Sequence, residues 1–370
     1  MPVMSVTMND SLVLRDDLER RTESALQPDQ HLLVREGDIA YNMMRMWQGA
    51  CGLATADCIV SPAYVVLAPK PGIDSRFAYH WFKSNQMIHL FWAYSHGLTE
   101  DRLRLYFDEF AEIPASPPPL EQQRRIVAVL DAWDRAIDQT ERLIAAKRRL
   151  YRGMIARYAA QFHGERVEFG DLANLISDRV QPGAGNAPDT SIELENIESE
   201  TGRILGSENV SGDSALRSRF EAGDTLFGKL RPYLRKFAHP NFDGICSTEI
   251  WVLRANTAKL NPSLLFYLVQ TPEFEAAATK QSGSRMPRAD WDLVSATPVP
   301  CPRDPSRQST AAAMLSSAIS ALHPEMLRLE ALRNQKRGLM QKLLAGEWRL
   351  DDRFDSRPLA PRAALAGGAA

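Results

Sequence analysis

The stretch GDIAYNMMR at residues 37–45 decides the fold, because the related stretch GDTLFGKLR follows 186 positions later, at residues 223–231. At the same offset SPAYVVL (61–67) aligns with STEIWVL (247–253), and IP (113–114) aligns with VP (299–300). An alignment held without gaps over this length is hard to obtain by chance, and self-similarity at a fixed period indicates a repeated structural unit. The sequence therefore predicts an internal duplication.

Each copy is predicted to contain a mixed module of strands and helices, a proline-rich hinge and one long helix. The β-branched and aromatic runs at 63–67 and 250–253 are typical of buried strands. Prolines cluster after both modules, where neither a helix nor a central strand can continue. The predicted domains are residues 1–119 (first module), 120–164 (first long helix), 165–305 (second module), 306–350 (second long helix) and 351–370 (disordered tail).

The first module is predicted to lack its opening segment. Its Gly37-Asp38 pair has 36 residues before it, whereas about 58 residues separate Glu165 from Gly223. The missing part corresponds roughly to residues 165–188. Either the true start lies upstream of Met1, or the missing piece is supplied in another way.

The two long helices carry apolar residues at steps of three and four, which is a heptad pattern. A core stripe within an ordinary domain is the alternative interpretation, but the duplication favours two helices that pair with each other. Pro324 is expected to kink or split the second helix. The apolar positions expected to form the paired, partner-binding helices are Ile126, Leu130, Trp133, Ile137, Ile144, Leu315, Ile319, Leu322, Leu329 and Met340.

Composition excludes several classes of protein. Hydrophobic residues make up 44% of the chain, which is enough for sizeable cores, and the four cysteines form neither a CxxC pair nor a disulfide framework. No apolar run reaches the roughly 18 residues of a membrane span, and the N-terminus lacks a basic-then-apolar signal. A reduced, cytoplasmic protein with no membrane partner is therefore expected.

The net charge of −2 is an average over blocks of opposite sign. Residues 1–119 carry 10 basic and 15 acidic side chains, and residues 165–300 carry 14 and 19. Residues 120–164 carry 9 basic and 5 acidic side chains, and residues 301–370 carry 11 and 7. The modules are thus acidic and the predicted helices basic, which argues against strong non-specific DNA binding by the modules themselves.

Motifs for catalysis are absent from the sequence. There is no GxxxxGK[ST] loop for nucleotide phosphates and no GxGxxG after a strand. His80, His89 and His96 are surrounded by aromatic residues, so we expect packed or interfacial histidines rather than metal ligands. The sequence therefore predicts no catalytic residue, no metal site and no cofactor bound by this chain.

Two strings resemble segments of the specificity subunits of type I restriction–modification systems. PPLEQQRRI (118–126) resembles the start of the first conserved helix of that family, and QKRGLMQKLLAG (335–346) resembles the end of the second. The Gly-Asp turns also match, and the resemblance extends to about Leu350. It departs in the short first module, in Pro324 and in SRQS (306–309), which replaces LEQQ.

This resemblance implies an α+β chain with two tandem target recognition domains, separated by two long helices that pair as an antiparallel coiled coil. The domains would each read one half of a bipartite site on double-stranded DNA. The helices would dock two methyltransferase subunits, which bring S-adenosylmethionine, and restriction/translocase subunits would join for cleavage. The specificity subunit itself would catalyse nothing.

DNA contacts are then expected from cations, because phosphate contacts give affinity and contacts to base edges give selectivity. A solvated or ion-paired surface arginine is the alternative interpretation for each of them, and Arg45 and Arg231 could instead brace the Gly-Asp turns. The predicted DNA-binding residues are Arg45, Arg102, Arg104, Arg217, Arg219, Lys229, Arg231, Arg235, Lys236, Arg285 and Arg288.

Two other functions remain open on the sequence alone. The chain could be a coiled-coil interaction scaffold, or an orphan specificity protein, with one degenerate recognition head. A self-sufficient DNA-modifying enzyme is disfavoured because the chain lacks a cofactor loop.

Overall fold

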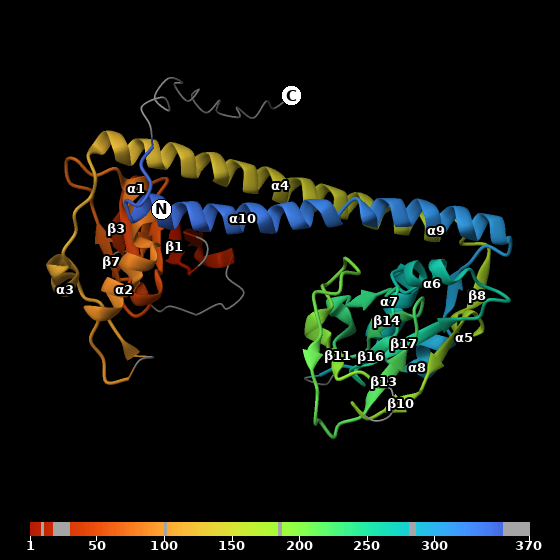
Figure 1. The fold of residues 1–370 in the computed structure, drawn as a ribbon. Helices are drawn as coiled ribbons and strands as arrows, with labels where there is room; N and C mark the ends of the chain where they lie inside the picture. The colour runs from red at the N-terminus through yellow and green to blue at the C-terminus, as the bar shows by residue number, and fades with distance from the viewer. Residues whose placement is uncertain (9–10, 18–29, 100–101, 184–186, 281–285, 351–370) are drawn as a thin grey trace, which may run out of the picture. The chain divides into compact units, whose positions relative to one another are not determined.

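The computed structural model of the protein describes residues 1–8, 11–17, 30–99, 102–183, 187–280 and 286–350. The chain divides into two compact units. The first unit contains Met1–Asp138 and the residues from Glu330 onward, and the second contains Gln139–Leu329. Each unit combines β-sheets with helices (Figure 1), so the predicted α+β class is confirmed. The prediction of a disordered tail at 351–370 falls outside the described residues.

Three long helices account for the heptad pattern. The first is α4 (Leu120–Gln161), which contains no proline and one glycine. The second predicted helix is divided into α9 (Pro305–Ser320) and α10 (His323–Leu344). The break, at Ala321 and Leu322, places Pro324 in the first turn of α10, where its missing N–H and its ring are tolerated.

The apolar positions of these helices pack differently in the two units. In the first unit Ile126 and Leu130 of α4 share a buried cluster with Leu343 of α10. In the second unit Ile144 shares a core with Leu315, Ile319 and Leu322, and Lys147 forms an ion pair of 2.9 Å with Glu325. Of the ten predicted positions, Ile126, Leu130, Ile144, Leu315, Ile319 and Leu322 are buried, while Trp133, Ile137, Leu329 and Met340 are half-buried.

The described residues of the first unit form two sheets and three short α-helices. One sheet has the order β2-β1-β6-β3 and the other β5-β4-β7. The strands are β1 (Val3–Val6), β2 (Leu12–Leu14), β3 (Leu32–Val34), β4 (Ile39–Asn42), β5 (Cys51–Leu53), β6 (Cys58–Val60) and β7 (Tyr64–Leu67). The helices are α1 (Ser75–Phe82), α2 (Asn85–Ala93) and α3 (Phe107–Glu112).

In the part of the second unit that the structure describes there are three sheets, with the orders β10-β13-β16-β11-β12, β15-β14-β17-β9 and β18-β8. Their strands are β8 (Arg166–Glu168), β9 (Ala173–Ile176), β10 (Arg179–Val180), β11 (Thr190–Ile192), β12 (Glu208–Asn209), β13 (Arg217–Phe220), β14 (Thr225–Gly228), β15 (Phe237–Ala238), β16 (Gly244–Cys246), β17 (Ile250–Ala255) and β18 (Pro298–Pro300). The short helices are α5 (Phe169–Leu172), α6 (Pro262–Leu268), α7 (Pro272–Thr279) and α8 (Trp291–Ser295).

The strand pairs of the two units share their register. In the first unit Ile39 pairs with Leu67 and Leu32 pairs with Val60. In the second unit the pairs 186 positions later, Thr225 with Leu253 and Ser218 with Cys246, occupy the same places. Because register fixes which side chains share a face of a sheet, equivalent residues of the two units occupy equivalent places, although β17 is buried where β7 is half-buried. The sheet order is also shared, strand for strand, except at two edges.

Those two edges define what the first unit lacks. Strands β9 and β10 lie at edges of the second unit's sheets, and the first unit shows no equivalent strand among its described residues. The same holds for β8 and α5. These elements cover residues 166–180 of the second unit, which lie within the predicted stretch 165–188.

A buried glutamine ties each long helix to its module. The backbone N–H of Asp74 donates to Oε1 of Gln123 at 2.9 Å, and Nε2 of Gln123 donates to the carbonyls of Gly72 and Pro118. Gln123 is 1% exposed, and Asp74 caps α1. The glutamine thus connects a helix cap, a loop and a proline hinge.

Gln308 does the same in the second unit. Its Oε1 accepts from the N–H of Asn261, which caps α6, and its Nε2 donates to the carbonyls of Lys259 and Pro302. Gln308 therefore has the role of Gln123 at an offset of 185 positions, although SRQS stands where LEQQ is expected.

Candidate nucleic-acid interface

The Gly-Asp turns are built alike in the two units. Gly37 and Gly223 have φ values of 90° and 89°, a left-handed conformation that glycine adopts without steric cost. The Asp38 carboxylate accepts from the N–H of Arg35 at 3.0 Å, and the Asp224 carboxylate accepts from the N–H of Glu221 at 2.8 Å. Each turn directs its strand, β4 or β14, towards the loop that carries the predicted cations.

Arg45 and Arg231 do not brace these turns. Both Nε and Nη2 of Arg254 donate to the Asp224 carboxylate at 2.8 Å, so Arg254 holds the second turn. Arg45 donates to Gln48 at 3.0 Å instead. The structural alternative for Arg45 and Arg231 is therefore wrong, and both side chains are exposed.

In the second unit the loop after β14 meets a segment that lies far along the chain. Leu230 forms an isolated β-bridge with Arg288, and the N–H of Arg231 donates to the carbonyl of Pro287 at 2.8 Å. The N–H of Ala289 donates to the carbonyl of Lys229. These bonds bring together two cation-bearing stretches that are far apart in sequence. We call residues 229–235 with 286–288 the second loop cluster.

In the second loop cluster, two residues with a strained backbone flank an exposed aromatic ring. Arg231 and Arg235 have φ values of 51° and 52° on either side of the short helix Pro232–Leu234. A non-glycine residue in this region costs of order 1 kcal/mol, and such residues concentrate at functional sites. Between them Tyr233 is 55% exposed, whereas the nearby Phe220 and Phe227 are buried.

The first unit has an equivalent cluster, made of residues 43–48 and 102–105. The N–H of Leu105 donates to the carbonyl of Met43 at 2.9 Å, and Arg104 is bridged to His96. This arrangement places Arg45 on one segment and Arg102 and Arg104 on the other, all exposed. We call it the first loop cluster.

The predicted DNA-binding cations divide into two groups. Arg217 pairs with Glu193 and Asp213, Arg219 with Asp178, Arg235 with Glu200 and Glu275, and Arg288 with Glu249, while Lys236 donates to the carbonyl of Leu194. The predicted cations that form no ion pair with a described acid are Arg45, Arg102, Arg104, Lys229 and Arg231. Arg285 lies outside the described residues. These five cations all belong to the two loop clusters.

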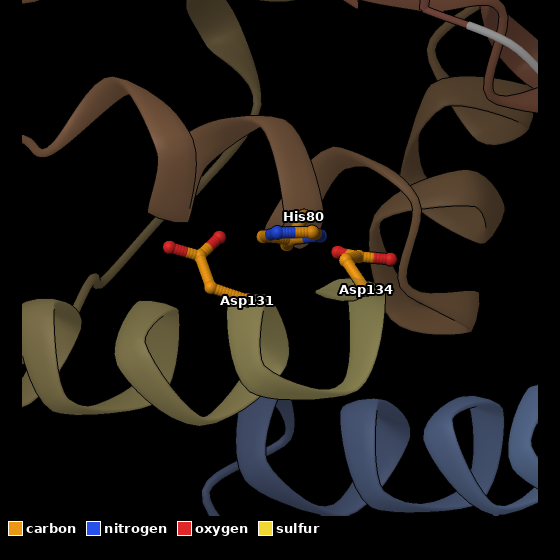
Figure 2. A group of neighbouring side chains, drawn as sticks. All are labelled: His80, Asp131 and Asp134. Atoms are coloured by element: carbon orange, nitrogen blue, oxygen red, sulfur yellow. The ribbon is translucent and has the colours of Figure 1, made fainter. Parts of the chain in front are cut away.

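The three predicted histidines do not come together. His89 and His96 are exposed, and His89 stacks on Trp92. His80 of α1 is 7% exposed, and its ring lies between the carboxylates of Asp131 and Asp134 of α4 (Figure 2). The ligand atoms of these three residues lie within 4.8 Å of one another. The two aspartates were not predicted from the sequence, although their spacing of three residues places them on one helix face.

This group is balanced in charge without a metal ion. Asp131 pairs with Arg76, and Asp134 pairs with Lys336 of α10 at 2.5 Å. Burial, helped by the Lys336 ammonium, lowers the pKa of His80 to about 4, although Asp134 opposes the shift. His80 is therefore neutral at pH 7. We interpret the group as a polar contact that fastens α1 to α4 and α10 within the first unit.

The depressed pKa of His80 predicts acid sensitivity. An unfolded histidine binds its proton near pH 6.5 and the folded His80 only near pH 4, so stability is complete above pH 6.5 and falls between these values. The loss is about 3 kcal/mol from this group. Urea unfolding at pH 7 and pH 4 should show a smaller loss for His80→Phe, which copies Phe266 at the equivalent position. An equal loss in both proteins would contradict this.

The four cysteines are buried, free and separate. Burial raises the pKa of the Cys51 and Cys301 thiols to about 11 and that of Cys246 to about 12. Thiols with such pKa values are protonated at neutral pH and are poor nucleophiles.

The first part of the chain is similar to a known family of proteins. Residues 6–147 match the family described as the type I restriction modification DNA specificity domain. The specificity subunit of the type I restriction enzyme EcoDI from Escherichia coli is 28% identical over 145 residues. That alignment covers 38% of this chain and 32% of the relative, so it spans about a third of the relative's length.

Two solved structures share the fold. The type I restriction-modification S subunit from M. genitalium has a TM-score of 0.51 at 14% identity, covering 87% of this chain and 86% of that one. The second is a chain from a structure that describes complex assembly and conformational transition of the type I R-M system. It has a TM-score of 0.51 at 16% identity, covering 87% of this chain and 85% of that one. Among the described residues, no helix has the length and apolar character to cross a membrane.

Proposed function

The chain belongs to the family of specificity subunits of type I restriction–modification systems, and from that premise we propose that it reads a bipartite site on double-stranded DNA. In this proposal the two units contain two tandem target recognition domains, and each loop cluster reads one half of the site. The chain has no catalytic role. Methylation is carried out by partner methyltransferase subunits, which bind S-adenosylmethionine.

One observation supports the proposal. Each unit has a loop cluster at the equivalent position of its fold, and the predicted cations that form no ion pair with a described acid belong to these two clusters. Such an arginine can donate to phosphate or to the O6 and N7 atoms of guanine without first breaking an ion pair. Arg231, with the exposed ring of Tyr233 next to it, has this character in the second unit. In the first unit, Arg45 and Arg104 are likewise exposed and form no ion pair with a described acid.

The net acidity of the modules is compatible with this arrangement. In the second unit several acids are held in ion pairs with cations outside the loop cluster: Glu193 and Asp213 pair with Arg217, and Glu200 pairs with Arg152. Their charge is compensated locally, so it repels DNA less than the bare count of acids implies. The basic face of the helices, and the partner subunits, would add phosphate contacts.

We assign the scaffold role to the long helices, paired as an antiparallel coiled coil. The contacts within each unit support this assignment, since early residues of α4 pack on the end of α10 and later residues of α4 pack on α9 and the start of α10. This packing buries most of the predicted apolar positions. Partner methyltransferase and restriction/translocase subunits would therefore bind the outer faces, where Leu143, Leu150 and Leu327 are exposed.

An exchange of modules tests this function. Residues 165–300 would be replaced by the corresponding module of another specificity subunit, and the modified DNA motif would be mapped in cells that contain the methyltransferase partner. We expect one half of the motif to change and the other to stay. A change in both halves, or in neither, would contradict the assignment of one half-site to each unit.

A second candidate function is an interaction scaffold with one degenerate head. The observation that favours it is the missing counterpart of residues 166–180 among the described residues of the first unit. Mapping the modified DNA motif also distinguishes the two functions, because a degenerate first head gives a motif with only one specific half.

A further inference from the structure

One arginine of the second loop cluster has a backbone conformation that a glycine adopts in the first unit. Arg235 has a φ of 52°, and Gly49, 186 positions earlier, has a φ of 83°. Each follows a short helix, Pro232–Leu234 or Met46–Gln48, and donates its N–H to the carbonyl of the first residue of that helix. The two loops therefore end in the same conformation, although only glycine adopts it without a steric cost.

The side chain of Arg235 makes contacts that offset this cost and that glycine cannot make. Its Nε lies 3.4 Å from Oε1 of Glu200, and its Nη1 pairs with Glu275 of α7. The side chains of Arg235 and Glu200 are 20% and 21% exposed. Ion pairs that are partly buried are screened less than pairs on an open surface. The first unit has His89 at the position equivalent to Glu275, so it lacks the acid as well as the arginine.

Glu200 lies on a turn that also has a left-handed backbone. Its φ is 66°, and its N–H donates to the carbonyl of Arg235 at 2.9 Å. In the described part of the chain the only non-glycine residues with a positive φ are Glu200, Arg231 and Arg235. Residues in this conformation concentrate at functional sites. All three belong to the second loop cluster or touch it directly.

Glu200 also connects the loop to the long helix α4. Its carboxylate pairs with Arg152 of α4. The preceding residue, Tyr151, is 3% exposed and donates to Oε1 of Gln270 at 2.7 Å, which holds this part of α4 against the segment between α6 and α7. The result is a continuous network of four charged side chains within the second unit: Arg152, Glu200, Arg235 and Glu275.

We propose that Arg235 is a positioning residue that fixes the second loop cluster to α4 through Glu200. The network holds the backbone on both sides of Tyr233, so that this ring and Arg231 are in place before DNA binds. This role rests on the proposed function of the chain. A loop that is ordered beforehand loses less conformational entropy when it binds. Arg235 thus acts through its neighbours and does not itself contact DNA.

Binding of the assembled methyltransferase complex to altered duplexes tests this role. One duplex carries the motif that the complex modifies, and in a second the half read by the second unit is replaced. The ratio of the two affinities measures discrimination at that half. Arg235→Gly copies Gly49 and relieves the strained backbone, and it should reduce this ratio by about tenfold. Discrimination against a duplex altered only in the other half should stay unchanged.

Glu200→Gln distinguishes positioning from a direct contact with DNA. It removes an acid beside Arg235, so an arginine that contacted phosphate would bind all duplexes more tightly in this variant. We expect instead the same loss of discrimination as for Arg235→Gly, and no further loss when the two are combined, because both break one network. Glu195→Gln is the control, since Glu195 is an exposed acid outside the network and the change in charge is the same. Circular dichroism shows whether each variant is folded.

Unchanged discrimination in Arg235→Gly and Glu200→Gln, with discrimination present in the unaltered complex, would overturn the positioning role and leave the proposed function standing. An equal loss of affinity for all duplexes in Arg235→Gly, with tighter binding in Glu200→Gln, would also overturn it, since Arg235 would then contact DNA. An unaltered complex that did not discriminate at either half would contradict the proposed function and this role together.

Discussion

Replacing both Lys229 and Arg231 with alanine is expected to weaken binding of the assembled complex to its DNA site by about 100-fold, because each good cation contact contributes ~1–3 kcal/mol. These two cations of the second loop cluster form no ion pair with a described acid, and Glu249, whose pKa Arg288 lowers with the help of Lys229, keeps its ion pair with Arg288. Stability should therefore change little. The salt dependence of binding should also weaken, by about one unit of slope for each phosphate that the protein ceases to contact.

Arg303→Ala is the matched control for this pair of substitutions. It removes a positive charge from the same unit, at an exposed position outside the loop cluster. Fluorescence anisotropy with a labelled duplex, measured at several salt concentrations, gives both the affinity and the slope. If the control weakened binding as much as the double variant did, the effect would be one of overall charge and the loop cluster would not be the reading surface.

Gln308→Ala is expected to destabilise the second unit by about 4 kcal/mol, because three buried backbone groups lose their partner at ~1–3 kcal/mol each. Gln308 is 2% exposed, so water does not replace these bonds. Gln123→Ala should do the same in the first unit. Urea unfolding followed by circular dichroism measures the change.

Arg124→Ala is the control, since Arg124 is an exposed neighbour of Gln123 on α4. It should cost less than about 1 kcal/mol. A similarly small cost for Gln308→Ala would show that the glutamine does not hold the module to the helix as its contacts indicate.

Much of the fold could be predicted from the repeat, and the reason is physical. An ungapped offset of 186 positions preserves the spacing between neighbouring strands, so equivalent strands pair in the same register, as Ile39 with Leu67 and Thr225 with Leu253 do. The break before Pro324 follows from local chemistry alone.

The candidate site was harder to predict. A charge count cannot distinguish Arg217, held by Glu193 and Asp213, from Arg231, because the difference lies in contacts between distant residues. The proximity of Leu230 to Arg288 depends on a bridge between segments far apart in the chain. The group around His80 likewise joins separate helices. The signal for it, two acids three residues apart and a distant histidine, is too common to use alone.

Mapping of methylated bases across the genome of cells that express this chain with its methyltransferase partner tests the central claim most directly. We predict modification at a single motif made of two specific halves with a fixed gap, and the disappearance of one half's specificity when Lys229 and Arg231 are both replaced with alanine. Modification at one uninterrupted motif, or a pattern that does not depend on this chain, would contradict the claim.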